Sequence, residues 1–122
     1  MTQEDKDLLL KDLCARLPYG VKVEITHWRN RDKGMIDSKI FRVPLDINKA
    51  SVLIKPTSDI RPYLFPLSSM TEEQKTELEQ IKNNEDAPYY HDINDFFLKY
   101  HLDNRHLIEK GLAIDATRLN IY

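Results

Sequence analysis

The stretch that most constrains the fold is residues 60–74, where a strand signal is followed at once by a helix signal. Residues 60–65 are predicted to form a strand. Pro62 removes a backbone N–H donor from it, so the strand should lie at an edge or pair on one side only. Thr71 and Gln74 then fit a capping box, in which each side chain bonds the other residue's backbone N–H. The chain is therefore predicted to have a β-rich first half and a helical second half.

Residues 5–17 are predicted to form the first helix. Its apolar residues recur at helical spacing in one stripe, formed by Leu9, Leu10, Leu13, Cys14 and Leu17. Charged side chains, among them Asp12, are expected on the opposite side. Cys14 lies within the stripe, so a buried small hydrophobe is its expected role and a nucleophile is the alternative. Pro18 ends the helix, because the residue before a proline avoids the α conformation.

Residues 21–29 and 35–43 are predicted to form a β-hairpin around the polar turn 30–34. Apolar and polar residues alternate in the first strand, so one face should be buried and the other wet. The second strand does not alternate cleanly, and a bulge near residues 37–38 would restore its phase. A short apolar run at residues 51–55 is a further candidate strand.

Three helical segments are predicted in the second half. Residues 71–82 are polar almost all round, which is typical of a helix that lies on the surface. Asp92 is expected to cap a second helix with a broad apolar face. Asp103 is expected to cap a short helix that ends at Gly111. Residues 112–114 could then add a strand or simply pack.

The predicted fold class is α+β, in a single domain over residues 1–122. We expect an N-terminal helix packed on a small antiparallel sheet of three to five strands, followed by two or three C-terminal helices. A chain of 122 residues can bury one core without metal or disulfide staples. Its polar start, its single cysteine and the lack of an apolar run of ~20 residues lead us to expect a soluble, cytoplasmic protein with no membrane contact.

No sequence motif for chemistry is found. The four histidines lack metal-ligand spacing, the serines lack a G-x-S-x-G elbow, and the three glycines form no phosphate-binding loop. We therefore predict no catalytic residue, no metal site and no cofactor. A third hypothesis is an enzyme whose site assembles only in the folded chain. Its best candidate group is Tyr63, Tyr89, Tyr90 and His91.

Charge is unevenly distributed along the chain, whose net charge is −2. Residues 22–61 carry nine basic and five acidic side chains, and residues 62–122 carry six and eleven. These halves should attract each other and leave an ordinary surface. The candidate binding surface combines an aromatic ring with basic side chains at the hairpin: Trp28, Arg29, Arg31, Lys33 and Arg42. The competing interpretation is a solvated hairpin tip with Trp28 tucked against the core.

The expected function is that of a non-catalytic protein-interaction or accessory module. An unknown partner protein or self-association would use the helix at residues 71–82 and the edge strand at residues 60–65. The alternative is weak nucleic-acid binding through the basic Trp28–Lys33 hairpin. The sequence pI of about 6.1 argues against that alternative.

Three stretches carry a resemblance to a known family: residues 13–23, 61–73 and 101–113. They read LCARLPYGVKV, RPYLFPLSSMTEE and HLDNRHLIEKGLA. Together they resemble a family of small uncharacterised proteins from Bacteroides-type gut bacteria and their phage-like or mobile elements. Relatives typically carry arginine, tyrosine and glycine where this chain has Phe65, Asn104 and His106. The resemblance implies a cytoplasmic accessory protein of prophage-like origin, and it carries over no catalytic or binding residue.

Overall fold

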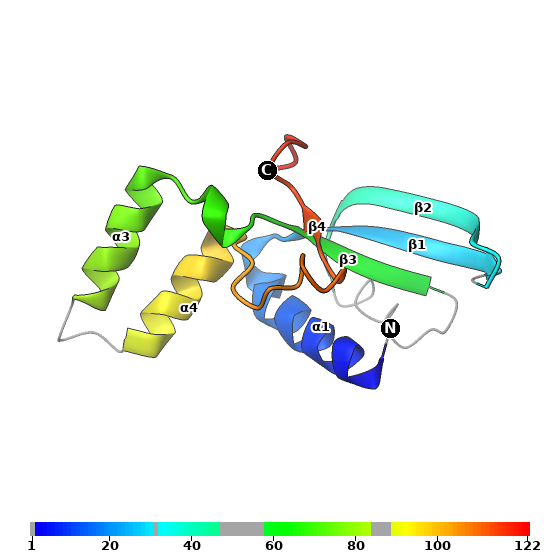
Figure 1. The fold of residues 1–122 in the computed structure, drawn as a ribbon, viewed down its shortest axis with the longest axis horizontal. Coiled ribbons are helices and arrows are strands. Elements are labelled where there is room, and N and C mark those ends of the chain that lie inside the picture. The colour runs from blue at the N-terminus through cyan, green and yellow to red at the C-terminus, as the bar shows by residue number, and fades with distance from the viewer. Residues whose placement is uncertain (1, 31, 47–57, 84–88) are drawn as a thin grey trace.

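The computed structural model describes residues 2–30, 32–46, 58–83 and 89–122, and it confirms the α+β fold class (Figure 1). The helices and strands are α1 (Gln3–Arg16), β1 (Lys22–Asn30), β2 (Met35–Pro44), β3 (Ser58–Leu64), α3 (Glu72–Lys82), α4 (Tyr89–Lys99) and β4 (Ile114–Asp115). Short 3-10 turns, η1 (Leu17–Tyr19) and η3 (Leu67–Ser69), precede β1 and α3. The strand predicted at residues 51–55 lies outside the described residues.

The strands of the described residues form one sheet in the order β2-β1-β3-β4. β1 pairs antiparallel with β2 and β3, as predicted, whereas β4 pairs parallel to β3, so the sheet is mixed. The bulge predicted in β2 is confirmed. Pairing steps from His27 and Ser38 to Trp28 and Ile36, and it thereby skips Asp37.

β3 has a neighbour on each side but pairs with only one of them at any residue. Its register with β1 runs from Ser58 to Pro62, and its register with β4 covers only Tyr63 and Leu64. Pro62 therefore pairs on one side only, as its missing N–H predicts. The same strand is not an edge strand, because β4 extends the sheet beyond it.

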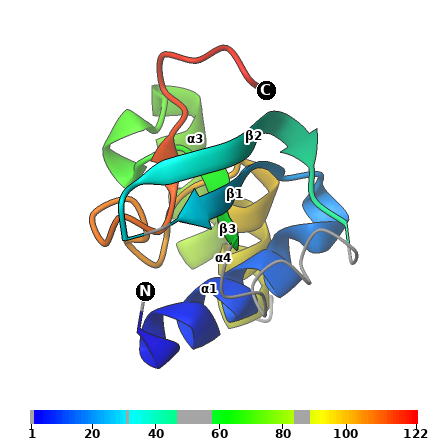
Figure 2. The ribbon, with the colours of Figure 1, turned by 90° about the vertical axis from the view of Figure 1, so that its right-hand side faces the viewer.

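α1 covers one face of the sheet, and the α3–α4 pair extends from the end of the molecule opposite the β1–β2 hairpin (Figures 1 and 2). The main core lies between α1 and the sheet and includes Leu9, Leu13, Val23, Ile25, Ile60 and Leu64. A separate cluster joins α3 and α4 through Leu78, Phe96 and Leu102. The capping box predicted at Thr71 and Gln74 begins α3 and is confirmed.

The buried face of α1 differs from the predicted stripe. The buried residues of the helix are Leu9, Asp12, Leu13 and Arg16. Leu10 and Cys14 are exposed, so the prediction of a buried Cys14 is wrong. The reason is that Arg16 Nε lies 2.7 Å from Asp12 Oδ2, and both side chains are fully buried. Each charge neutralises the other, so the pair occupies interior positions that an apolar pattern cannot reveal.

Two predicted helix starts are wrong by a few residues. α1 begins at Gln3, because Thr2 and Asp5 form a capping box there. α4 begins at Tyr89, so Asp92 lies in the first turn of the helix and is not its N-cap. A carboxylate in the first turn is stabilised by the helix dipole. Both helices therefore begin a few residues before their predicted starts.

The segment after α4 forms turns, so the helix predicted between Asp103 and Gly111 is wrong. The Asp103 carboxylate does act as a cap: it accepts from the backbone N–H of Leu107 at 2.8 Å and of Ile108 at 2.9 Å. These bonds close a wide turn instead of starting a helix. Gly111 then takes a φ of 74°, which glycine adopts without strain.

Replacing His106 with glycine is expected to raise the free energy of unfolding by about 0.5–1 kcal/mol. His106 is exposed and has a φ of 59°, in the left-handed region. This conformation strains an L residue, whereas glycine adopts it freely. Urea denaturation measures the difference. The matched control is Glu109→Gly. Glu109 does not have a positive φ, so glycine relieves no strain there and should lower the free energy of unfolding. An equal effect of the two substitutions would contradict the prediction.

Candidate functional site

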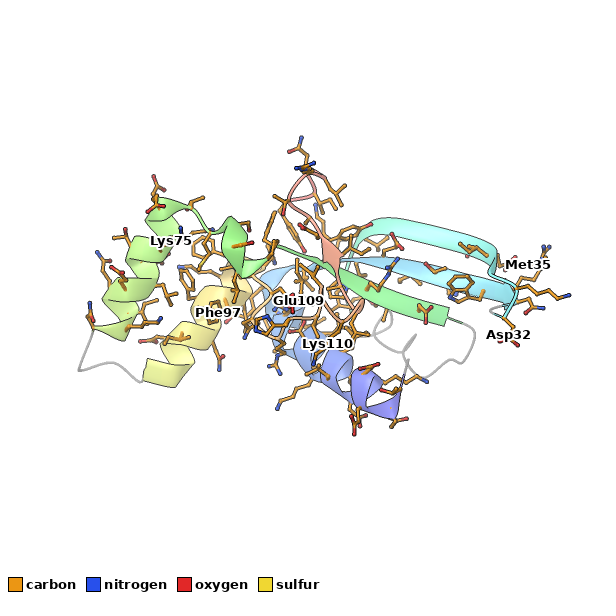
Figure 3. All side chains as sticks on the ribbon, in the orientation of Figure 1. Asp32, Met35, Lys75, Phe97, Glu109 and Lys110 are labelled. Atoms are coloured by element: carbon orange, nitrogen blue, oxygen red, sulfur yellow. The ribbon has the colours of Figure 1, made fainter. Side chains whose placement is uncertain are left out.

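The predicted binding residues that the structure describes are spread along the hairpin. Arg29 and Lys33 are exposed near the turn, where Figure 3 shows Asp32 and Met35 at the far end of the molecule. Arg42 belongs to the other end of β2, because the neighbouring Val43 pairs with Val23. At ~3.3 Å per residue, it lies roughly 20 Å from the turn. Arg31 lies outside the described residues.

Trp28 faces a hollow on the sheet. Its indole Nε1–H donates to Asp59 Oδ2 at 2.6 Å, and the side chain is half-buried. Asp59 is held beside it because Thr26 of β1 pairs with Asp59 of β3. These contacts agree with the competing interpretation, in which Trp28 packs against the protein instead of projecting from the hairpin.

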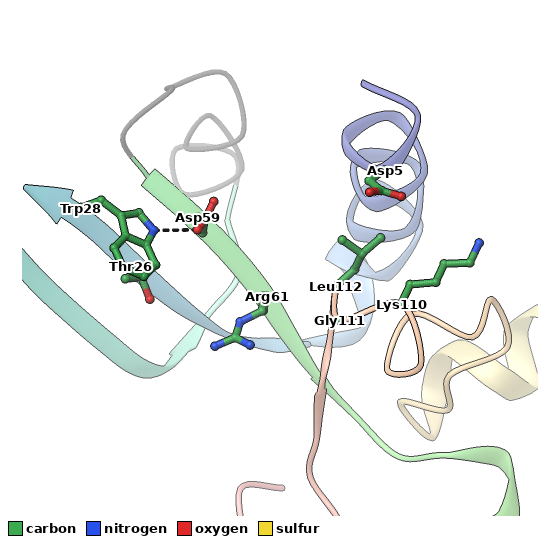
Figure 4. A pocket seen from close by; sticks show the side chains of 8 residues that line it. All are labelled: Asp5, Thr26, Trp28, Asp59, Arg61, Lys110, Gly111 and Leu112. Atoms are coloured by element: carbon green, nitrogen blue, oxygen red, sulfur yellow. Dashed lines mark hydrogen bonds between the residues drawn. The ribbon is translucent and has the colours of Figure 1, made fainter. Parts of the chain in front are cut away.

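The hollow beside Trp28 has a volume of about 480 Å³ (Figure 4). Its lining comes from β1, β3, the start of α1 and the loop before β4: Asp5, Thr26, Trp28, Asp59, Arg61, Lys110, Gly111 and Leu112. Two carboxylates face one guanidinium and one ammonium, so the charges balance. The hollow could hold a small polar molecule by hydrogen bonds. The described lining contains no histidine, cysteine or serine that would act as a nucleophile or base.

Glu24 of β1 has a buried carboxylate that contacts two residues of β3. Its Oε1 accepts from Arg61 Nη2 at 2.9 Å, and its Oε2 accepts from the Tyr63 hydroxyl at 3.4 Å. Glu24 is 4% exposed and Thr26 is 5% exposed, so the prediction of a wet face on this strand is wrong. No local pattern in the sequence reveals this burial, because the register that sets Glu24 opposite Arg61 joins residues 37 positions apart. The Glu24–Arg61 ion pair is a cross-strand contact that stabilises the sheet.

The structure does not bring together the four residues of the enzyme hypothesis. Tyr63 is buried against Ala116 and Ile121. The end of α4 meets the end of β3, because Phe65 pairs with Leu102. The first turn of α4, which holds the other three residues, therefore lies about 15 Å away along the helix.

Arg16 is the centre of a polar cluster that sequence reasoning missed. Its Nη2 donates to the backbone oxygen of Leu102 at 2.7 Å and to Asn104 Oδ1 at 3.0 Å, in addition to its bond with Asp12. Arg105 Nε lies 3.3 Å from Asp12 Oδ1. These contacts fasten α1 to the segment that follows α4. The role of the cluster is to position two distant parts of the chain.

A second hollow, of about 370 Å³, lies where the ends of β3 and α4 and the start of α3 meet residues 117–122. We call it the tail hollow. Its aromatic lining residues are Phe65, Tyr100, His101 and Tyr122. The rings of His101 and Tyr122 are stacked, with centroids 3.8 Å apart and planes 13° apart. Burial, together with the positive charges of Arg16 and Lys22, lowers the pKa of His101 to about 4. The imidazole is therefore neutral at pH 7.

The Tyr122 hydroxyl takes the place of a backbone hydrogen bond between β1 and β3. Lys22 and Tyr63 continue the register set by Val23 and Pro62. The hydroxyl accepts from the backbone N–H of Lys22 at 2.8 Å and donates to the backbone oxygen of Tyr63 at 2.7 Å. Burial raises the pKa of Tyr122 to about 12, so the phenol keeps the proton that this bond needs. Residues 121–122 thus join β1 to β3 where the two strands part.

The low pKa of the half-buried His101 imidazole predicts a specific pH dependence of stability. The unfolded chain binds a proton near the ordinary His101 pKa of 6.5, whereas the folded chain binds it only near pH 4. Stability therefore falls as the pH decreases through this window. Between pH 7.5 and 4.5 we expect wild type to lose about 2 kcal/mol more than His101→Asn, after a reduction for solvent screening. Asparagine tolerates the φ of 55° at this position. Parallel urea titrations measure the difference, and equal losses would contradict the prediction.

Within the part of the chain that the structure describes, no three His, Cys, Asp or Glu side chains lie close enough to share a metal ion. No described helix is both long enough and apolar enough to cross a membrane. Comparison of the chain with protein-family models, with curated proteins and with solved structures found no match.

Proposed function

We propose that the protein is a non-catalytic interaction module that docks on a partner protein through the far end of the β1–β2 hairpin. One observation carries this proposal: every described residue from Arg29 to Ser38 is exposed, although the segment contains two large apolar side chains. Met35 is 36% exposed and Ile36 is 47% exposed. An exposed apolar side chain at the end of a hairpin offers a partner protein an anchor to bury.

The β1–β2 pairing continues to the turn of the hairpin, where Asn30 pairs with Met35. The described part of β3, which begins at Ser58, pairs with β1 from Val23 to His27. Figure 1 shows this end of the hairpin projecting from the body. The residues at this end of the hairpin, including the turn, are exposed and therefore accessible to a partner.

The partner surface would combine an apolar depression with acidic side chains around it. Ile36 supplies the apolar anchor, Met35 offers a second apolar side chain toward the other face of the hairpin, and the exposed Arg29 and Lys33 supply positive charge at the same end. An apolar centre with a charged rim is the usual arrangement of a transient interface. Rim charges of this kind accelerate association with a surface of opposite charge.

Strand addition supports docking less well than the exposed side chains do. β2 is the outer strand of the described sheet, but its register with β1 shifts at Asp37 and again between Val43 and Ile40. Such bulges disrupt the regular row of backbone groups that an added strand needs. β3, which the sequence also offers for pairing, lies between β1 and β4.

Nucleic-acid binding through the same hairpin is also less well supported. The indole of Trp28 bonds Asp59, whose carboxylate repels phosphates. The exposed turn carries Asp32 as well as Lys33, which weakens the positive field. The aromatic and the basic groups therefore do not act at one place.

A photocrosslinking residue at position 36 tests the proposal. With p-benzoylphenylalanine in place of Ile36, in the cells that make the protein, we expect a crosslink to one partner protein. The control carries the same residue in place of Leu10, which is 42% exposed on α1, and it should give no such crosslink. Equal crosslinking from both positions, or crosslinks from position 36 only to nucleic acid or to a second copy, would overturn the proposal.

A further inference from the structure

We propose that the tail hollow binds an uncharged aromatic molecule of one or two rings that carries a hydroxyl or ring N–H group. This site is distinct from the hairpin and does not depend on its function. The volume of about 370 Å³ lies near the lower end of the ~300–1,000 Å³ typical of small-molecule sites. A compound of this size would fill it.

The lining favours a flat ring. Tyr122 is 42% exposed, and its ring lies 5.7 Å from that of Phe65 at an interplanar angle of 53°. His101 stacks on Tyr122, and both residues line the hollow. Aromatic rings pair best in offset-stacked or edge-to-face arrangements, and the hollow offers ring faces and edges at different angles. A planar ligand would therefore find partners on more than one side.

The charges of the lining are already satisfied. Lys99 is the one residue of this lining whose side chain carries an ammonium or carboxylate group, and its Nζ lies 2.7 Å from Glu77 Oε1. The other Glu77 oxygen accepts from the Tyr100 hydroxyl at 2.6 Å. His101 is neutral at pH 7, since burial lowers its pKa to about 4. A charged ligand would lose hydration without gaining a counter-charge, so an uncharged ligand is favoured.

Two hydroxyl groups can orient the ligand. Ser69 Oγ donates to the backbone oxygen of Pro66 at 2.7 Å, so its remaining capacity is to accept. Thr71 Oγ1 accepts from the Gln74 N–H at 3.1 Å and still has its own proton to donate. A ligand hydroxyl could use either group, and a ring N–H could use Ser69. This is the reason for including one polar group in the ligand class.

The backbone around the ring stack is strained. His101 has a φ of 55°, in the left-handed region, whereas the φ of 51° at Asn120 is one that asparagine tolerates. One residue belongs to the stack itself, and the other turns the chain two residues before Tyr122. Strained backbone of this kind occurs preferentially at ligand sites, where the surrounding structure holds it.

An NMR titration with indole tests the inference. In ¹H–¹⁵N spectra we expect saturable shifts of the amides of His101, Leu102 and Thr117. Tryptamine, a cation, and indole-3-acetate, an anion, should bind at least ~3-fold more weakly than indole because of their charge. The inference is overturned if indole causes no saturable shift up to ~10 mM, a concentration well above weak fragment affinities. Shifts confined to other residues, or tighter binding of either charged analogue, would also overturn it.

Two neighbouring substitutions locate the site. Thr117→Trp would fill the tail hollow and should weaken indole binding at least ~10-fold by steric exclusion. Arg118→Trp is the matched control, because Arg118 lines the adjoining hollow but not the tail hollow, and it should leave the affinity within ~2-fold. If Thr117→Trp does not fold, Ser69→Leu narrows the hollow from another side and should give the same loss. Unchanged affinity in a folded filling variant would contradict the assignment.

Discussion

Replacing Arg16 with alanine will lower the free energy of unfolding by about 3–5 kcal/mol. Arg16 and Asp12 are both fully buried, so the substitution leaves the Asp12 carboxylate in the interior without its closest partner. It also removes the donor that bonds the Leu102 oxygen and Asn104 Oδ1. Guanidinium denaturation at pH 7, followed by circular dichroism, measures the loss.

Two controls separate the pair from general effects on α1. Lys11→Ala changes an exposed neighbour and should cost less than ~0.5 kcal/mol. The double variant Asp12→Leu with Arg16→Met removes both fully buried charges together and should recover part of the loss, since only the partly exposed Arg105 loses a partner. If Arg16→Ala costs no more than Lys11→Ala, the buried pair does not fasten the helix as the contacts indicate.

Replacing Tyr122 with alanine will lower the free energy of unfolding by about 3 kcal/mol. The substitution removes the stack on His101 and the hydroxyl that bridges β1 and β3. The Lys22 N–H and the Tyr63 carbonyl then lose their common partner. The same denaturation measurement gives the size of the effect.

The phenylalanine variant divides this effect into two parts. Tyr122→Phe keeps the ring and should cost about 1–2 kcal/mol, because only the hydroxyl bonds are lost. It should also speed deuterium exchange of the Lys22 amide, a readout that loss of ring packing alone would not produce. The control, Tyr19→Phe, removes a hydroxyl bond to Asp95 at 2.6 Å near the surface and should leave Lys22 protection unchanged. Unchanged Lys22 exchange in Tyr122→Phe would contradict the bridging role.

Local signals predicted the elements whose determinants lie close together in the sequence. The Thr71 capping box spans three residues, and the hairpin depends on one polar turn between two strands. Pro62 predicts one-sided pairing through its own missing N–H. The bulge at Asp37 follows from a break in alternation that the sequence shows directly.

The features that sequence reasoning missed depend on partners far along the chain. Arg16 can be buried because Leu102, 86 residues away, accepts one of its N–H groups. Glu24 is buried because Arg61 lies opposite it on another strand. Hydrophobic periodicity treats each of these charges as a surface residue. The predicted stripe of α1 therefore includes the buried Leu9 and Leu13 but extends to the exposed Cys14 instead of the buried Arg16. Burial of a charge is decided by its partner and not by its neighbours in sequence.

The candidate surface was predicted only in part, for a similar reason. The sequence places Trp28 and Arg29 side by side, but adjacent strand residues point to opposite faces. Only the fold shows that Trp28 turns toward Asp59. It also shows that Met35 and Ile36 stay exposed at the end of the hairpin.

The affinity of Ile36→Glu for the protein captured through position 36 is the most direct test of docking by the hairpin. We expect its Kd to rise at least ~10-fold, because a carboxylate would replace an apolar anchor next to acidic partner groups. Leu10→Glu makes the same chemical change at an exposed site on α1 and should leave the Kd unchanged. Isothermal titration calorimetry measures both variants against wild type. Equal affinity of Ile36→Glu and wild type would contradict the claim that this end of the hairpin is the docking surface.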